Sequence, residues 1–306
     1  MLTFIVAACV GVVVGILSGL LGIGGGTVMV PVFRLGFGLS AIEAAATSLF
    51  TIIPTSLAGC VTHIRNKTCR VPLGVAAGLG GACTSPVGVW LASISPSWAI
   101  MAAAALIIGY SAISMLKKAR ALPKPEKKAV AKKGAACVGV SVSSVLVVPL
   151  AASAPAPAPA STPTPAPTPA PAPVPQHSAA SFTKSQLFKG ALIGLAAGVA
   201  SGYVGVGGGF IMVPLFISVV GISMRHASGT SLIAVTILAI PGAITQALLG
   251  NVDFIAGAAM AVGSIPGALL GASLMRRVPD RTLRFLFGGF LIFVAILLVV
   301  NEFIVL

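Results

Sequence analysis

Residues 18–33 read SGLLGIGGGTVMVPVF, and residues 201–216 read SGYVGVGGGFIMVPLF. The two stretches are offset by 183 residues (201 − 18), and the same offset aligns much of the remaining chain. Thr47-Ser48-Leu49, for example, aligns with Thr230-Ser231-Leu232 without a gap. The chain is therefore predicted to contain two copies of one glycine-broken apolar unit. In membrane proteins, two such halves facing each other across a central site are the architecture of a transporter.

The composition is typical of a protein embedded in lipid. Of its 306 residues, 57% are hydrophobic and 8% are charged, and the mean hydropathy is +1.08. Soluble domains carry roughly 25% charged residues, so we expect an all-α, polytopic membrane protein. The net charge of +14 lies mainly in predicted loops, as the positive-inside rule expects. The lipid bilayer and a small anion, rather than nucleic acid, are the expected partners.

No catalytic or cofactor motif is present in the sequence. The five cysteines have no metal-ligand spacing such as CxxC, and they are interpreted as small apolar packing residues. The sequence contains no nucleophile elbow, no HExxH and no phosphate-binding GxxxxGK[ST]. We therefore predict that the protein is not an enzyme, needs no cofactor or metal, and transports without an ATP-driven step.

The predicted organisation is two four-helix repeats separated by an insert. The segments are repeat 1 (1–118, with spans 2–22, 40–61, 71–94 and 97–116), the insert (119–183), and repeat 2 (184–306, with spans 187–205, 225–249, 254–275 and 282–305). Short half-helices at 27–35 and 210–220 are expected to follow the glycine breaks, the first continuing its span. This gives eight core spans.

The insert differs in character from both repeats. A basic run at 117–133 contains eight Lys or Arg, 134–152 is apolar, and 153–176 is rich in proline and alanine. The proline-rich tract cannot form regular helix hydrogen bonds and is predicted to be an extended spacer, with 153–183 disordered. Residues 134–152 are a candidate ninth span.

A ninth span would change the charge distribution across the membrane. Without it, thirteen Lys and Arg residues would lie on one side and six on the other. With it, the second repeat flips and the distribution becomes sixteen against three. Because the positive-inside rule favours the stronger bias, the charge count favours a crossing at 134–152 and repeats related by inversion.

The glycine triplets are the candidate binding site. Each glycine in a triplet lowers helix propensity by roughly 1 kcal/mol relative to alanine. The triplets are Gly24, Gly25 and Gly26 in the first repeat and Gly207, Gly208 and Gly209 in the second. Unwound backbone at membrane depth is tolerated only where protein or a watery cavity covers it. The freed N–H groups at the start of the following half-helix would suit an anion. The alternative is a tight turn between two helices.

Several polar residues accompany the triplets. Ser18 and Ser201 lie beside the breaks, while Thr47, Ser48, Thr230 and Ser231 follow them at equivalent positions. Their hydroxyls are predicted to contact a substrate oxyanion, or alternatively to cap a helix or bond to its carbonyls. Glu43 and His226 also occupy equivalent positions (43 + 183 = 226). They could form a proton-linked pair, or simply mark the interfacial ends of two helices.

The doubled pattern SGxxGxGGGxxxVPxF, with a Thr-Ser pair in the next helix, resembles the TauE/SafE sulfite exporter family. The resemblance covers nearly everything except residues 120–183, and this long insert departs from the family's compact linker. It implies a secondary transporter in a bacterial-type inner or plasma membrane that moves sulfite, sulfoacetate, thiosulfate, sulfate or related anions. A carrier or channel for other small organic anions and a non-transporting membrane scaffold are the alternatives. The oligomeric state and the direction of transport stay open.

Overall fold

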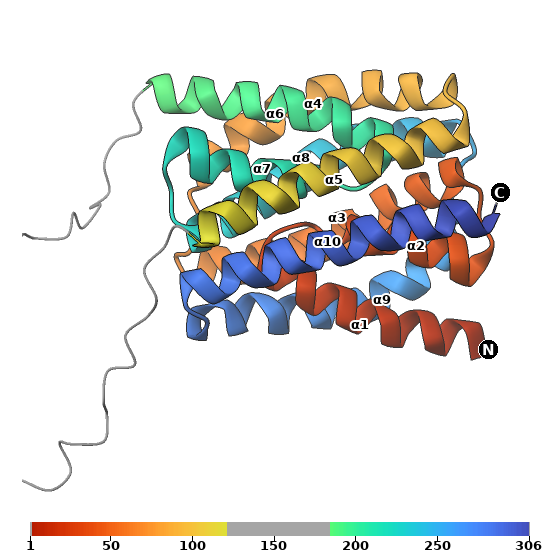
Figure 1. The fold of residues 1–306 in the computed structure, drawn as a ribbon, viewed down its shortest axis with the longest axis horizontal. Helices are drawn as coiled ribbons and strands as arrows, with labels where there is room; N and C mark the ends of the chain where they lie inside the picture. The colour runs from red at the N-terminus through yellow and green to blue at the C-terminus, as the bar shows by residue number, and fades with distance from the viewer. Residues whose placement is uncertain (1, 121–183, 306) are drawn as a thin grey trace, which may run out of the picture. The chain divides into compact units, whose positions relative to one another are not determined.

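The fold is known from a computed structural model that describes residues 2–120 and 184–305 (Figure 1). Residues 121–183, including the candidate span 134–152 and the proline-rich tract, lie outside the described residues. Helices make up the described ranges, and no strand occurs in them. They are α1 (Leu2–Leu21), α2 (Gly26–Phe37), α3 (Ala41–Arg65), α4 (Val71–Ser93), α5 (Ser97–Arg120), α6 (Lys184–Val204), α7 (Gly209–Leu215), the π-helical η1 (Phe216–Val220), α8 (Met224–Leu248), α9 (Phe254–Leu274), the short 3-10 turn η2 (Met275–Arg277) and α10 (Asp280–Val305).

The predicted all-α polytopic class is confirmed. Within the described ranges, seven helices are long and apolar enough to cross a membrane, namely α3, α4, α5, α6, α8, α9 and α10. Polar residues mark where some of them begin. Ser40 and Glu43 form a capping box at the start of α3, and Asp253 accepts hydrogen bonds from the first turn of α9.

The first helix of each repeat packs against the other repeat. A Cβ atom added at Gly11 of α1 would lie 2.6 Å from the carbonyl oxygen of Met260 in α9. One added at Gly19 would meet the carbonyl oxygen of Ala268, two turns further along both helices. α1 and α9 are therefore parallel and in backbone contact. In the same way, Gly194 of α6 faces the backbone of α4, so the glycine faces of α1 and α6 let helices of the two repeats approach closely.

α3 and α8 run antiparallel through the centre. Thr236 Oγ1 donates a hydrogen bond to Ser56 Oγ (2.8 Å). A Cβ at Gly59, further along α3, would lie 3.0 Å from Leu232, which comes earlier in α8. α5 and α10 run in opposite directions as well (Figure 1). Because these are equivalent helices of the two repeats, the second repeat is inverted relative to the first.

The short helix α2 explains the inversion. Gly26 lies beside Ile52 in the middle of α3, and α2 ends at Phe37, shortly before α3 begins at Ala41. α2 therefore runs back toward the end at which α1 started, and the prediction that 27–35 continues the first span is wrong. The α1–α2 hairpin starts and ends on the same side of the membrane. The net crossings of the first repeat are therefore the three made by α3, α4 and α5, and those of the second repeat are made by the equivalent helices. An odd number of crossings inverts the second repeat without any span at 134–152.

This arrangement gathers the basic residues at one end of the bundle, which we call the basic end. It is where α3, α5 and α9 finish and α4, α6, α8 and α10 begin. Of the fourteen Lys and Arg residues in the described ranges, thirteen lie there and Arg34 lies at the opposite end. The thirteen are Arg65, Lys67, Arg70, Lys117, Lys118, Arg120, Lys184, Lys189, Arg225, Arg276, Arg277, Arg281 and Arg284. By the positive-inside rule, we expect the basic end to face the cytoplasm.

Cysteine labelling in intact cells tests this topology. In a variant without native cysteines, Lys67→Cys and Arg277→Cys should be protected from an impermeant maleimide, whereas Ser97→Cys and Phe254→Cys should react. All four positions are exposed, so differences report on sidedness rather than burial. Labelling of Lys67→Cys and Arg277→Cys from opposite sides of the membrane would contradict the inverted arrangement.

Candidate functional site

Both glycine breaks adopt left-handed backbone conformations. After α1 ends, Gly24 and Gly25 have φ angles of 82° and 86°, and Gly207 and Gly208 have 80° and 66° in the second repeat. Residues with a Cβ rarely adopt such conformations. The triplets therefore end one helix and redirect the chain before the next begins. The predicted breaks are present in both repeats.

The two breaks touch each other. A Cβ added at Gly26 would lie 2.7 Å from the carbonyl oxygen of Val206, and one added at Gly209 would lie 2.7 Å from the carbonyl oxygens of Gly22 and Ile23. The start of each half-helix thus packs on the backbone that leads into the other. This contact lies at mid-height in the bundle, because Gly26 of the first triplet and Gly207 of the second both adjoin Ile52 in the middle of α3.

Ser48 and Ser231 hold the breaks in place from the opposite repeat. Ser48 Oγ donates to the carbonyl oxygen of Gly205 (2.7 Å), and Ser231 Oγ donates to that of Gly22 (2.7 Å). The two bonds are related by the 183-residue offset and cross between repeats. Both hydroxyls are buried, so they satisfy carbonyls that the helix breaks leave without intrahelical partners.

Thr47 and Thr230 each accept a hydrogen bond from the backbone of a loop in the other repeat. The Thr47 Oγ1 atom accepts from the N–H of Asp253 (3.0 Å), and Thr230 Oγ1 accepts from the N–H of Arg70 (2.9 Å). Each threonine thereby fastens the start of a neighbouring helix, α9 or α4. The Thr-Ser pairs thus have structural partners, and direct contact with a substrate stays a prediction for all four hydroxyls.

Ser18 and Ser201 differ, because their hydroxyls have no hydrogen-bond partner within the described chain although both are buried. A Cβ added at Gly25 would lie 3.5 Å from the Ser18 Cβ, and one at Gly208 would lie 3.4 Å from the Ser201 Cβ. Each serine therefore stands directly beside a break. A buried hydroxyl without a partner is costly, and an oxyanion acceptor would satisfy it. The first N–H groups of α2 also lack intrahelical acceptors and carry partial positive charge.

The sequence interpretation missed two further buried hydroxyls. Thr27 Oγ1 and Ser228 Oγ also have no partner within the described ranges. Thr27 immediately follows the first glycine triplet, and Ser228 lies against Gly22. The equivalent residues of the other repeat are Phe210 and Ala45. Because neither carries a hydroxyl, comparison of the two repeats did not indicate Thr27 or Ser228 as site residues. These four hydroxyls belong to the two breaks or their immediate neighbours, whereas a fifth buried hydroxyl without a partner in the described ranges, that of Ser85 in α4, lies beside Gly242 of α8.

Glu43 and His226 do not form a pair. Each is the third residue of its helix, and because α3 and α8 are antiparallel, the two side chains lie at opposite ends of the bundle. Glu43 Oε2 accepts from the Ser40 N–H (2.9 Å), and His226 Nδ1 lies 2.8 Å from Ser223 Oγ. Both engage in local contacts at helix ends, as the alternative interpretation expected.

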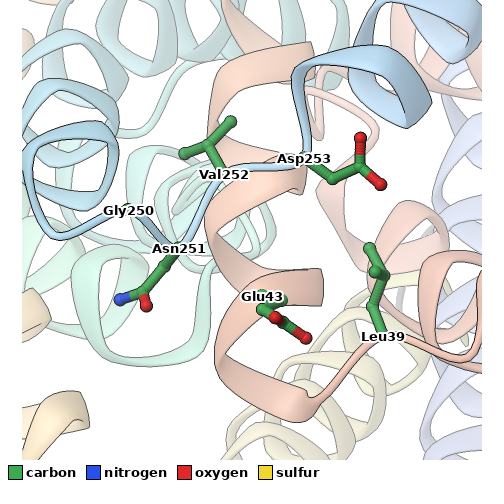
Figure 2. Close-up of a pocket in the computed structure, with 6 residues that line it drawn as sticks. All are labelled: Leu39, Glu43, Gly250, Asn251, Val252 and Asp253. Atoms are coloured by element: carbon green, nitrogen blue, oxygen red, sulfur yellow. The ribbon is translucent and has the colours of Figure 1, made fainter.

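A cavity of about 200 Å³ opens at the end opposite the basic end. It is lined by Leu39, Glu43 and residues 250–253, including the carboxylate of Asp253 (Figure 2). Two carboxylates make this pocket unfavourable for an anion. The equivalent positions at the basic end carry Arg70 and His226 instead, so the two ends of the bundle differ in charge. The basic end is the one that attracts anions.

Contacts at the basic end join several helices. Arg225 lies 3.4 Å from the Asp280 carboxylate and also donates to the Val278 carbonyl oxygen (2.8 Å). In the loop between α3 and α4, burial raises the pKa of the Cys69 thiol, which therefore stays protonated near neutral pH. In the described ranges, no group of three or more His, Cys, Asp or Glu residues is close enough to hold a metal ion.

Comparison with known proteins places these features in a family. The family model described as "Sulfite exporter TauE/SafE" matches residues 7–298. "Probable membrane transporter protein YdhB" of Bacillus subtilis is 26% identical over 271 residues, covering 88% of this chain and 89% of the relative. "Probable membrane transporter protein YunE" of the same organism is 23% identical over 292 residues, covering 92% of each. No solved structure matches the chain significantly.

Removing the bonds between repeats should destabilise the breaks. Ser48→Ala and Ser231→Ala each leave a buried carbonyl without its partner, so we expect a loss of about 1–3 kcal/mol of folding free energy. Ser273→Ala is the matched control, because the Ser273 hydroxyl is exposed and bonds only within its own helix. Thermal unfolding in detergent measures both effects. Equal melting temperatures for the three variants would contradict this role.

Proposed function

Because the chain belongs to the sulfite exporter TauE/SafE family, we propose that this multi-pass membrane transporter is a secondary carrier of sulfur-containing anions, such as sulfite, sulfoacetate, thiosulfate or sulfate. We place it in a bacterial-type cell membrane. The observation that supports a central anion site most directly is the pair of buried, unpartnered serine hydroxyls, Ser18 and Ser201, beside the touching glycine breaks.

In this proposal, the anion binds where the two breaks meet. The Ser18 and Ser201 hydroxyls donate to its oxygen atoms, together with backbone N–H groups around Gly24, Gly25 and Gly26 and around Gly207–Gly209. Ser48 and Ser231 keep the breaks in position, so they act on the anion indirectly. The basic end raises the local anion concentration. The inverted halves then expose the site alternately to the two sides of the membrane.

Flux of labelled sulfite in proteoliposomes tests the proposal. Sulfite should enter or leave vesicles that contain the protein faster than protein-free vesicles, and unlabelled sulfate or sulfoacetate should compete better than acetate. Vesicles whose sulfite flux equals that of protein-free controls would contradict the proposed function. Preferential competition by acetate would point to a carboxylate carrier instead.

Ser18→Ala and Ser201→Ala test the site separately from the fold. Neither hydroxyl has a partner within the described chain, so their removal should not lower the melting temperature and, because a buried unpartnered hydroxyl is costly, should raise it slightly. A hydrogen bond to a charged group is worth about 1.5–3 kcal/mol. The apparent KM for sulfite should therefore rise by roughly tenfold to a hundredfold. Ser273→Ala again serves as the control, and an unchanged KM in both variants would refute the assignment.

A further inference from the structure

His63, near the end of α3 at the basic end, is fully buried. Its Nε2 atom lies 3.0 Å from the carbonyl oxygen of Gly19, and its Nδ1 atom lies 2.8 Å from Thr68 Oγ1. Gly19 belongs to the last turn of α1, directly before the first glycine break. The imidazole thus connects the end of α3, the loop that follows it and the helix that leads into the proposed anion site.

The contacts of His63 can accommodate two protonation states. Because a carbonyl oxygen only accepts, Nε2 carries a proton in either state. In the neutral ring, Nδ1 accepts a hydrogen bond from the Thr68 hydroxyl. In the imidazolium, Nδ1 donates to the Thr68 oxygen, and the hydroxyl can turn toward the His63 carbonyl oxygen, 3.2 Å away. A proton can therefore bind or leave without breaking the contacts of the ring.

The second repeat contains the same turn without a titratable group. Gln246 aligns with His63, and Asn251 aligns with Thr68. Asn251 Nδ2 donates to Gln246 Oε1 (2.8 Å). The backbone bond from residue 251 to residue 246 (3.1 Å) repeats the one from Thr68 to His63 (3.0 Å). A neutral amide pair therefore suffices to hold this turn, and the imidazole adds proton chemistry at one end only.

Positive charge dominates the end of the bundle where His63 lies, and this disfavours a second proton there unless an anion is near. The titratable groups on the segments at this end are Cys60 and Arg65 on α3, Lys67, Cys69 and Arg70 in the loop, Arg225 and His226 at the start of α8, and Arg276 at the end of α9. The last turn of α1 contributes none. In the described ranges, Asp280 is the carboxylate at this end, and it is paired with Arg225. A bound oxyanion would supply the missing negative charge.

We propose that His63 is the proton-binding site of the transporter and that it takes up a proton together with the anion. This inference rests on the proposed function, because it assumes that an oxyanion occupies the adjacent break. Binding of the two ions is then reciprocal, so that each tightens the binding of the other. Transport of the anion would consequently be driven by a proton gradient, with His63 as the group that binds the proton.

The test uses the chain's own second repeat as a design template. The double variant His63→Gln/Thr68→Asn copies the Gln246–Asn251 pair and removes the titratable ring while keeping a tether. Full-length protein in proteoliposomes is assayed with labelled sulfite in two modes, namely accumulation driven by an imposed pH gradient and exchange at equal pH. All variants are compared at the same pH values, so the titration of sulfite itself affects each equally.

We expect gradient-driven accumulation to fall at least tenfold in the double variant, while exchange stays within about twofold of wild type. Thr68→Asn alone should retain the gradient response, because His63 is still present. Gradient-driven accumulation that persists in the double variant, or that is lost in His226→Gln instead, would overturn the assignment of His63. A wild type with sulfite flux but no response to the gradient would overturn the inference and leave the proposed function standing. Absence of any wild-type sulfite flux would contradict both.

Discussion

The contact between the two glycine breaks is the constraint on which the rest of the structure depends. Backbone meets backbone there, and a single Cβ at Gly26 or Gly209 would lie 2.7 Å from a carbonyl oxygen of the other repeat. Both half-helices must therefore begin in the middle of the bundle. Each half-helix must also reach the first residue of the next long helix, α3 or α8, which lies at the end of the bundle where its repeat began. The chain therefore reverses direction at each glycine break. The hairpin that results leaves three further crossings per repeat, which is why the second half is inverted.

Inversion makes the arrangement of helices nearly symmetric, but the charged residues are distributed asymmetrically between the two ends of the bundle. Every described Lys and Arg except Arg34 lies at one end, whereas Glu43 and Asp253 line the mouth at the other. In a membrane, this asymmetry orients the protein. It also gives the two ends of the bundle different electrostatic potentials, so that the basic end attracts anions and the end with Glu43 and Asp253 repels them.

The sequence was sufficient for the local features and insufficient for the direction of the chain. The two glycine triplets indicated the breaks, because the low helix propensity that ends a helix is a property of glycine itself. A triplet such as Gly24–Gly26 shows where a helix ends but not where the chain turns next. That depends on contacts with the other repeat. The partners of Ser48 and Ser231 lie 157 and 209 residues away, and no local pattern connects them.

The hydroxyls around the centre fall into two groups with different energetics. Ser48 and Ser231 satisfy carbonyls that the breaks would otherwise leave buried without partners, so their main contribution is to the stability of the site. Ser18 and Ser201 have no partner among residues 2–120 and 184–305, so in this part of the chain their desolvation is not offset, and another molecule that accepts their hydrogen bonds would offset it. An inverted repeat with identical halves would have equal energies in its two orientations. In the proposed mechanism, the titratable His63 of one half has a neutral counterpart, Gln246, in the other, so that protonation changes the relative energies of the two orientations, and the proton carried with the anion couples transport to a proton gradient.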